Sequence, residues 1–322
     1  MATPIFIVGT PRSGTTWLSN VLGRHSRVAC VQESLSDKRG GVYESAFFSC
    51  VAGKFGDLKN NNNLIQLIET FAGSTFFIVS GIDKTIFYKK RPQTYHDFFR
   101  LFMDHLADKQ GADFWLEKTP SHTFHLKEIS QCYQDAKFVA IRRNSVDQIK
   151  SFVKLNEIIS GVKTQDIPFL KKKAELVDRI FSYYAHTKHL DNFIAKNPDK
   201  IWKIDYDDLI NTTEQVVRKL CAFLGLDFEK GLLKQDYAPN TSFKVKDDRD
   251  EVLSKGEVKG IQILSPLMKS VPYRIYRLLY LTKRALQRRN FPYWFFSYNI
   301  EKYGWSIVFG KGHERVKHNQ DD

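Results

Sequence analysis

The sequence has few of the residues from which disulfide-bonded and zinc-binding proteins are built. Four cysteines occur among its 322 residues, and no two of them form a Cys-x-x-Cys pair. The cysteines therefore indicate neither a zinc site nor a disulfide framework, and reduced thiols in a cytosol fit them best. Zinc-finger, RNA-binding, coiled-coil and repeat patterns are also missing, so we expect no nucleic-acid partner.

Long hydrophobic runs are missing as well. No apolar stretch reaches the roughly 20 residues that a membrane-spanning helix needs. The first apolar strand begins within five residues of Met1, which leaves no room for a signal peptide. We therefore expect a soluble, cytoplasmic protein.

The residues that are present suit an α/β fold with an anionic ligand. With 42% hydrophobic residues, the chain can bury one large α/β core. Its net charge of +13 favours polyanionic ligands or anionic surfaces. The charge does not choose between nucleic acid, a membrane and a doubly phosphorylated nucleotide.

One stretch near the N-terminus has the pattern of a phosphate-binding loop. The apolar run 5–8 predicts a buried strand, a turn rich in glycine and serine follows, and Leu18, Val21 and Leu22 recur at helical spacing. In such a loop the backbone N–H groups and the positive end of the helix bind one anion. The loop contributes Arg12, Ser13, Gly14, Thr15, Thr16 and Trp17.

A lysine is missing from this loop. The spacing Gly9-x4-Gly14 is that of the nucleotide triphosphatases, but Thr15 stands where their lysine follows the second glycine. Without that lysine the loop is poorly equipped for a β/γ-phosphate with magnesium, which argues against a small-molecule kinase. We expect one terminal phosphate at this loop and no bound metal.

Charged residues follow three further predicted strands. Glu33 lies just past residues 27–31, Lys118 follows the strand 114–116, and Arg143 ends the strand 137–143. Because ligands of α/β folds bind at the carboxyl ends of parallel strands, we expect these groups near the loop. Arg143 and Ser151 can bind a second phosphate, since a guanidinium donates paired hydrogen bonds to phosphate oxygens and a serine hydroxyl adds another donor.

These motifs resemble those of the sulfotransferases. Residues 10–17 are similar to their 5'-phosphosulfate loop, and residues 138–144 with Ser151 are similar to their 3'-phosphate site. The resemblance runs from residue 4 to about residue 256. It implies a P-loop NTPase-like α/β fold, with a central parallel sheet and helices on both faces. It also implies 3'-phosphoadenosine 5'-phosphosulfate (PAPS) as the donor and adenosine 3',5'-bisphosphate (PAP) as a product.

The resemblance implies donor-binding roles for residues later in the chain. Tyr206, Thr241 and Phe243 match positions that line the adenine pocket, and Trp17 would stack on the other face of the adenine. Lys255 matches the lysine of an Arg-Lys-Gly string that clasps the 3'-phosphate, although the arginine is missing here.

The catalytic residues follow from the same resemblance. Glu33 matches the general base of tyrosylprotein and heparan sulfate sulfotransferases. Lys118 matches a lysine of the heparan sulfate sulfotransferases that stabilises the leaving nucleotide. Arg12 would add a second positive charge there. Pro120 stands where the cytosolic family has a histidine base. His122 and His125 lie nearby, and imidazoles suit general base catalysis. They stay open as alternatives, but Glu33 is the leading base, because each histidine could instead contact the following helix.

The sequence therefore predicts in-line transfer of a sulfuryl group from PAPS to a hydroxyl of a carbohydrate, glycolipid or other small alcohol. A phenol or tyrosine-type acceptor is the alternative. Outside the enzymes, a non-catalytic nucleotide-binding protein or a membrane adaptor would share some of these features. Residues 35–60 are predicted to be loops that flank short helices and, like a predicted loop at 152–170, border the acceptor site.

The C-terminal part is set apart by its charge. We expect a sulfotransferase domain over residues 1–266 and a basic, aromatic extension over residues 267–322, packed on the domain or facing a membrane. From Lys269 to Asp322 there are eleven Lys and Arg residues against four acids. A helix predicted between residues 272 and 289 has Arg274, Arg277, Arg284 and Arg288 on one side and Ile275, Leu279 and Leu286 on the other. Either this helix docks and leaves its basic face in solvent, or residues 272–296 rest on anionic lipid.

Overall fold

The centre of the protein is a five-stranded parallel sheet with the strand order β2-β3-β1-β4-β5. The computed structural model describes residues 1–32, 41–160, 162–234, 252–287 and 293–296. The strands are β1 (Thr3–Gly9), β2 (Val28–Cys30), β3 (Phe114–Lys118), β4 (Lys137–Arg142) and β5 (Ile201–Asp205). The strands predicted from the sequence are thus confirmed, and so is the α/β class with a central parallel sheet.

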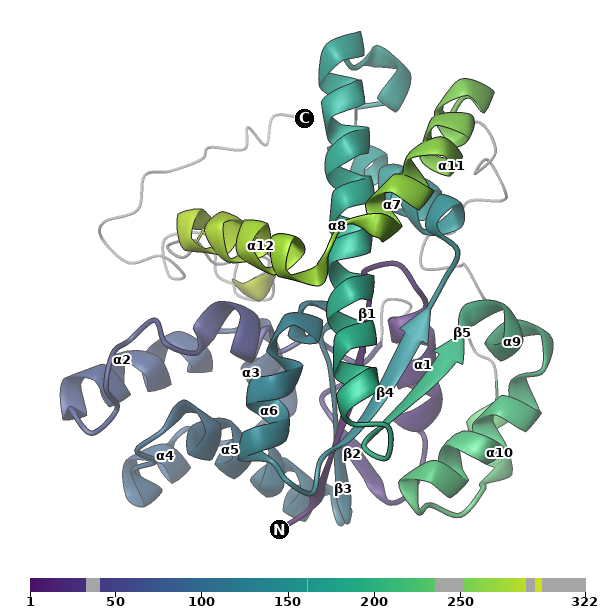
Figure 1. Cartoon of the computed structure of the whole chain (residues 1–322). Coiled ribbons are helices and arrows are strands. Elements are labelled where there is room, and N and C mark those ends of the chain that lie inside the picture. The colour runs from purple at the N-terminus through teal and green to yellow at the C-terminus, as the bar shows by residue number, and fades with distance from the viewer. Residues whose placement is uncertain (33–40, 161, 235–251, 288–292, 297–322) are drawn as a thin grey trace, which may run out of the picture.

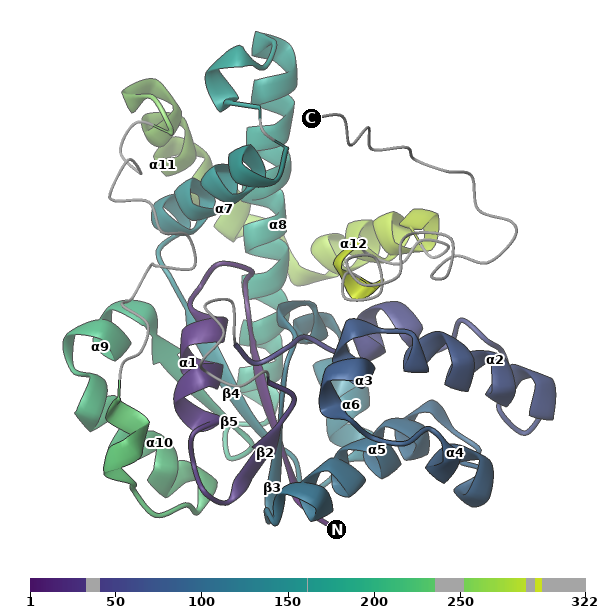
Figure 2. The same cartoon turned by 180° about the vertical axis from the view of Figure 1, so that it is seen from behind.

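Helices surround this sheet on both faces. The α-helices are α1 (Thr15–Leu22), α2 (Asn61–Ala72), α3 (Thr75–Ser80), α4 (Thr85–Lys90), α5 (Tyr95–Gln110), α6 (Leu126–Cys132), α7 (Ser145–Ser160), α8 (Phe169–Lys196), α9 (Tyr206–Asn211), α10 (Thr213–Leu224), α11 (Lys255–Ser270) and α12 (Tyr273–Gln287). Short helical turns are η1 (Phe47–Val51), η2 (Pro120–His125), η3 (Thr164–Asp166), η4 (Lys230–Leu233) and η6 (Tyr293–Phe296). Helices α1, α9 and α10 cover one face of the sheet and α2 to α6 the other (Figure 1 and Figure 2).

The central strand β1 is apolar throughout because both of its faces are covered. Ile5, Phe6, Ile7 and Val8 are fully buried. Phe6 and Val8 join the cluster under α2 to α6, whereas Ile5 and Ile7 join the cluster under α1, α9 and α10. This two-sided burial is why the strand shows a continuous hydrophobic run rather than an alternating pattern.

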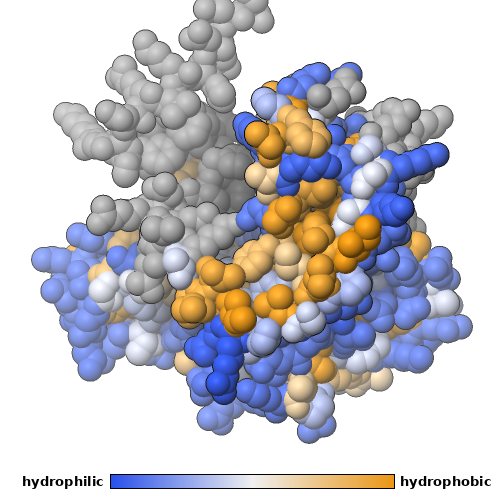
Figure 3. Space-filling view, turned by 45° about the horizontal axis from the view of Figure 1, so that its top comes forward, coloured by the Kyte–Doolittle hydropathy of each residue, from blue (hydrophilic) through white to orange (hydrophobic). Residues whose placement is uncertain are grey.

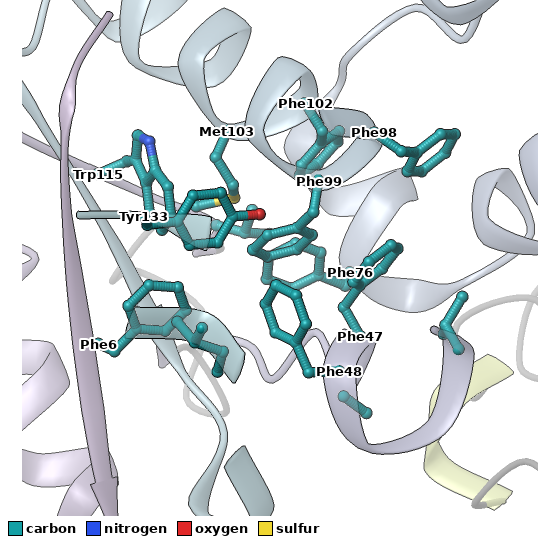
Figure 4. Packing of buried hydrophobic residues seen from close by; sticks show 14 of the residues in the cluster. Phe6, Phe47, Phe48, Phe76, Phe98, Phe99, Phe102, Met103, Trp115 and Tyr133 are labelled. Carbon is teal, nitrogen blue, oxygen red and sulfur yellow. The ribbon is translucent and has the colours of Figure 1, made fainter. Parts of the chain in front are cut away.

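Phenylalanine rings fill much of the larger core cluster (Figure 4). The Phe99 ring lies 4.7 Å from Phe47 and 5.3 Å from Phe48, measured between centroids. Phe47 and Phe48 come from η1, a turn inside the segment 35–60, so that part of the segment is packed in the core. Edge-to-face and offset pairs of this kind contribute about 0.5–1.5 kcal/mol beyond the burial of their area.

A third cluster lies beyond the sheet, where α8 extends past the carboxyl ends of the strands together with α7 and α11 (Figure 1). The prediction of a loop over residues 152–170 is wrong for its first part, since α7 continues to Ser160. Ile149 is buried against Ile180 of α8 and Ile261 of α11, and Val153 packs on the same cluster. Tertiary contacts with these two distant helices cover the apolar side of α7.

The C-terminal segment packs on the rest of the protein in two places. Helix α11 runs without interruption through residues 266 and 267, the predicted domain boundary, and α12 then packs against α8. Phe295 and Phe296 are buried in the larger core cluster, next to α3. These two rings are therefore buried in the protein. Contact with anionic lipid, one of the two alternatives for residues 272–296, does not hold for them.

Removing one ring from the aromatic cluster should destabilise the fold. Phe99→Ala is expected to lower the free energy of unfolding by about 3–5 kcal/mol, because the substitution removes buried area and leaves a cavity. Urea denaturation measures the change. The matched control is Phe169→Ala, whose side chain is 71% exposed, and we expect less than about 0.5 kcal/mol for it. Similar losses in both variants would contradict the assignment of this cluster as the stabilising core.

Candidate functional site

The carboxyl ends of four strands meet at one edge of the sheet. In the parallel register, Ile7 of β1 lies opposite Lys118 of β3, and Gly9 lies opposite Ile141 of β4. On the far side Arg142 of β4 pairs with Asp205 of β5. The segments that follow these strands therefore start side by side, as predicted from the charged residues at the strand ends.

The loop between β1 and α1 is tightly wound. Gly9 has φ +151° and a Cβ there would collide with the Ile141 carbonyl oxygen, while Gly14 has φ +101° and a Cβ there would come within 2.5 Å of the Tyr206 ring. Arg12 adopts a left-handed φ of 69°, which costs a non-glycine residue free energy and is often found at binding sites. The Ser13 hydroxyl donates to the Thr10 carbonyl oxygen at 2.7 Å. These constraints turn the loop back so that α1 begins at Thr15.

Arg12 contacts the helix that follows β4. Its Nε donates to the Ser151 hydroxyl oxygen at 3.2 Å, although the two residues are 139 positions apart. Burial, together with the nearby positive charge of Arg143, lowers the pKa of Arg12 from its usual value. Since two guanidinium groups repel each other here, an anion bound between them would be stabilised.

Tyr206 joins the loop to Arg143. The Arg143 guanidinium carbon lies 4.4 Å from the centre of the Tyr206 ring, in a cation–π contact. The same ring packs against Gly14. From the other side, the Tyr183 hydroxyl donates to the Arg143 carbonyl oxygen at 2.8 Å. The two predicted phosphate-binding segments are thus held together by one aromatic side chain.

Lys118 reaches the start of α1. Its side chain is buried, and Nζ donates to Glu44 Oε1 at 2.8 Å and to the Thr16 hydroxyl at 3.4 Å. The lysine therefore lies beside the predicted phosphate loop, as the sequence indicated. Glu44 remains partly exposed, with 31% of its side chain accessible to solvent.

Glu44 is the carboxylate of this site that the sequence analysis missed. Its position depends on contacts between distant segments: an antiparallel bridge joins Gln32 to Val42, and the Ser45 hydroxyl donates to Glu117 at 2.7 Å. The segment around Glu44 carries no motif, so the sequence offered little signal for it. Gln32 directly precedes Glu33, and Val42 lies two residues before Glu44. The bridge therefore joins the chain just before each of these two glutamates.

Behind Lys118 lies a buried polar cluster centred on Glu117. Its carboxylate is fully buried and accepts hydrogen bonds from the hydroxyls of Thr119 at 2.5 Å and Ser45, and from His122 Nδ1 at 2.8 Å. Burial alone would raise the pKa of Glu117, but His122 and these hydroxyl donors hold it below its usual value. The carboxylate therefore stays ionised and fixes the end of β3.

The histidines considered as bases have other partners. His122 is fully buried, and its Nε2 accepts a hydrogen bond from the Phe48 backbone N–H at 3.2 Å, while Nδ1 faces Glu117. Both ring nitrogens are engaged inside the core, which argues against His122 as the base. His125 Nδ1 lies 3.2 Å from Glu128 Oε2 at the start of α6, as expected for a residue that contacts the following helix.

The other residues predicted to bind the donor differ in how deeply they are buried. Ser13 and Thr15 are buried, Thr16 is exposed, and Trp17 packs partly buried on the cluster beside α1. Lys255 begins α11 and lines a depression of about 370 Å³ together with Lys150, the neighbour of Ser151. Glu33, Thr241 and Phe243 lie outside the described residues.

Comparison with known proteins identifies the family. The family model described as "Sulfotransferase family" matches residues 4–230, so the chain belongs to the sulfotransferase family. A putative protein-tyrosine sulfotransferase from Caenorhabditis briggsae is 23% identical over 233 residues, which cover 71% of this chain and 68% of the relative. Omega-hydroxy-beta-dihydromenaquinone-9 sulfotransferase Stf3 from Mycobacterium bovis is 24% identical over 273 residues, which cover 75% and 68% of the two chains.

Solved sulfotransferase structures are among the proteins to which this chain is similar. The sulfotransferase domain from the curacin biosynthetic pathway covers 84% of this chain and 99% of its own, with a TM-score of 0.48 and 17% identity. Mouse sulfotransferase SULT7A1, solved as a complex with PAP, covers 88% and 89%, with a TM-score of 0.42 and 14% identity. The central parallel sheet with helices on both faces, which the sequence predicted, is a feature of this chain's own structure.

Within the described ranges, none of the helices is both long and apolar enough to cross a bilayer. The same part of the chain contains no group of three His, Cys, Asp or Glu side chains arranged to hold a metal ion.

Replacing the buried carboxylate should destabilise the protein in a pH-dependent way. Glu117→Gln removes an acceptor of several hydrogen bonds, so we expect a loss of about 1–3 kcal/mol at neutral pH. Because the folded protein lowers the pKa of Glu117, its contribution is present above the unfolded value of about 4.3 and is lost as the pH falls through the folded value. The difference from the wild type should therefore shrink in acid.

Urea denaturation at pH 7 and at lower pH measures both effects. Glu214→Gln serves as the control, since Glu214 is half exposed and pairs with Arg218 on the surface of α10. Its change should stay below about 1 kcal/mol. An equal loss for both variants, or a gap between Glu117→Gln and wild type that widens in acid, would show that the buried carboxylate does not work in this way.

Proposed function

We propose that the protein transfers the sulfuryl group of PAPS to a hydroxyl of a carbohydrate, glycolipid or other small alcohol. Membership of the sulfotransferase family supports the transfer reaction. The observation that supports the donor most directly is the hydrogen bond between Arg12 and Ser151. It joins the loop assigned to the 5'-phosphosulfate to the helix assigned to the 3'-phosphate, and a 3',5'-bisphosphorylated adenosine needs both.

The donor would be held at its two ends. Arg12, the backbone N–H groups of the loop and the hydroxyls of Ser13, Thr15 and Thr16 would bind the phosphosulfate, because loop amides at a helix start favour anions. Arg143 and Ser151 would bind the 3'-phosphate, with Lys255 adding charge from α11. Trp17, Tyr206, Thr241 and Phe243 would contact the adenine.

The transfer would proceed in line. The acceptor oxygen forms its bond to sulfur while the bond from sulfur to the bridging oxygen of the donor breaks, and PAP leaves with negative charge on its 5'-phosphate. Lys118 and Arg12 would stabilise this charge, since fixed cations in a buried site act most strongly where charge develops. Lys118 is suited to this role because its ammonium group is buried beside Thr16 of the loop.

A carboxylate would accept the proton of the acceptor hydroxyl. Glu33 is the base proposed from the sequence, and Glu44 is a second candidate because its carboxylate pairs with Lys118 and is partly open to solvent. The bridge between Gln32 and Val42 supports considering both, since it joins the chain just before each of them. One of these two glutamates would act as the general base.

The acceptor class is the least constrained part of the proposal. Stf3 is named for an omega-hydroxy compound, which fits an alcohol acceptor, whereas the relative from Caenorhabditis briggsae is named for protein tyrosine. A phenol or tyrosine-type acceptor therefore remains the alternative. A panel of soluble alcohols and phenols with radiolabelled PAPS distinguishes the two.

Transfer rates of variants test the catalytic roles. Lys118→Ala should lower kcat at least a hundredfold, about 2.7–4 kcal/mol, as is typical when one group that stabilises developing charge is removed. Glu33→Gln and Glu44→Gln are compared in parallel, and the base is the residue whose replacement causes a similar loss while PAP still binds. Lys90→Ala, an exposed lysine of α4, is the control and should leave the rate unchanged. Near-normal rates in all three site variants would overturn the assignment.

Calorimetry tests the donor separately. We expect the protein to bind PAP more tightly than AMP, and Arg143→Ala to weaken PAP by about tenfold to a hundredfold with little effect on AMP, since a hydrogen bond to a charged group contributes about 1.5–3 kcal/mol. Equal affinity for PAP and AMP would contradict the two-phosphate site. PAP binding without transfer to any acceptor would instead indicate a non-catalytic binder, and turnover of ATP would indicate a kinase.

A further inference from the structure

The exposed hydrophobic residues gather on one part of the protein. Twelve large hydrophobic side chains in the described residues are exposed, and nine of them lie on α8, α11 and α12. We call these nine residues the apolar band: Phe169, Leu170, Val177, Ile263, Leu267, Ile275, Leu278, Leu279 and Leu281. Figure 3 shows hydrophobic side chains running across this face, with hydrophilic residues below them and to their right. Contiguous apolar surface of this kind usually marks an interaction site.

The way in which α12 docks explains why its aliphatic residues face solvent. Its inner side is made of tyrosines: Tyr276 is fully buried and its hydroxyl donates to the Met268 carbonyl oxygen at 3.0 Å, and the Tyr280 ring stacks on Phe124. Tyr273 packs edge-on against His189 of α8. The sequence-based expectation of a docked helix with a basic outer face is therefore wrong in part, because leucines share the outer face.

The charges on α11 and α12, which carry six of the nine residues of the apolar band, have one dominant sign. Residues 252–287 contain seven Lys and Arg residues and a single acid, Glu257, which is buried and pairs with Lys172 at 3.0 Å. The exposed cations of this segment are Lys255, Lys259, Lys269, Arg274 and Arg277. A second copy of the chain would bring these like charges together, whereas an anionic lipid surface would pair with them.

We propose that the apolar band and its cations form a docking surface for an anionic lipid bilayer. The leucines would enter the boundary between headgroups and acyl chains, and the cations would contact the anionic headgroups. Docking itself is independent of the transfer reaction. Docking on a bilayer has one consequence for the reaction, namely that the acceptor is a lipid-linked alcohol. This consequence rests on the proposed function.

The position of the band relative to the site supports this consequence. Phe124, on which Tyr280 of α12 stacks, belongs to η2, which begins two residues after Lys118. At the other end, α11 starts beside Lys150, the neighbour of Ser151. A bilayer on the band would therefore lie at the end of the molecule that carries the site (Figure 1).

Vesicle flotation with the full chain tests the docking surface. The protein should float with vesicles that contain phosphatidylglycerol and not with vesicles of phosphatidylcholine alone, and salt should weaken the binding. Leu267→Glu with Leu278→Glu should reduce binding at least tenfold. Lys90→Glu is the control, because it lowers the net charge by as much as the two substitutions together but lies on α4, away from the band. Equal losses in the control and the double variant, or no binding to either vesicle, would overturn the proposal.

Fluorescence distinguishes lipid from other occupants of the band. A polarity-sensitive dye is attached to Leu278→Cys in a Cys132→Ser background, and its emission should shift to the blue only when anionic vesicles are added. A dye that is already shielded without vesicles would mean that another part of the chain, or a second copy, covers the band, and sedimentation identifies which. Transfer to a soluble acceptor should stay normal in the double variant, so a failure of docking is separate from a failure of the proposed reaction.

Discussion

The pairing of β1 with β3 on one side and with β4 on the other determines where the charged groups of the site lie. The three strands are parallel and in close register, so they end near one level, at about Gly9, Lys118 and Ile141. The chain must therefore turn in a narrow space there. A loop with glycines at two critical points satisfies this constraint. The sheet thus brings the loop after β1 beside strand ends that lie more than 100 residues further along the chain.

The cations of this site are held by a second layer of buried polar contacts. Glu117, although fully buried, is ionised because Ser45, Thr119 and His122 surround it, and it anchors the strand end next to Lys118. Arg12, in contrast, is buried close to the positive charge of Arg143, and both its burial and this charge lower the pKa of Arg12. The fold holds these two cations close together even though their charges repel each other. An anionic ligand bound near both would reduce this repulsion, so the site is preorganised for an anion.

Local patterns in the sequence were sufficient to predict part of the fold and part of the candidate site. The phosphate loop, the strands and the positions of Lys118, Arg143 and Ser151 follow from short motifs and from the rule that ligands meet the carboxyl ends of parallel strands. Glu44, the burial of His122 and the full length of α7 could not be predicted in this way, because each depends on contacts with distant segments. The outer face of α12 was also misjudged, since helical periodicity alone does not reveal that its tyrosines, rather than its leucines, dock.

The close approach of Gly14 to the Tyr206 ring has a consequence for how this site can evolve. Any side chain at position 14 would need a smaller residue at position 206, and that change would remove the aromatic surface on which the Arg143 guanidinium rests. Positions 14, 206 and 143 are therefore expected to change together or not at all among related chains. The Tyr206 ring thus couples the two halves of the proposed nucleotide site, so that neither half is expected to change without the other.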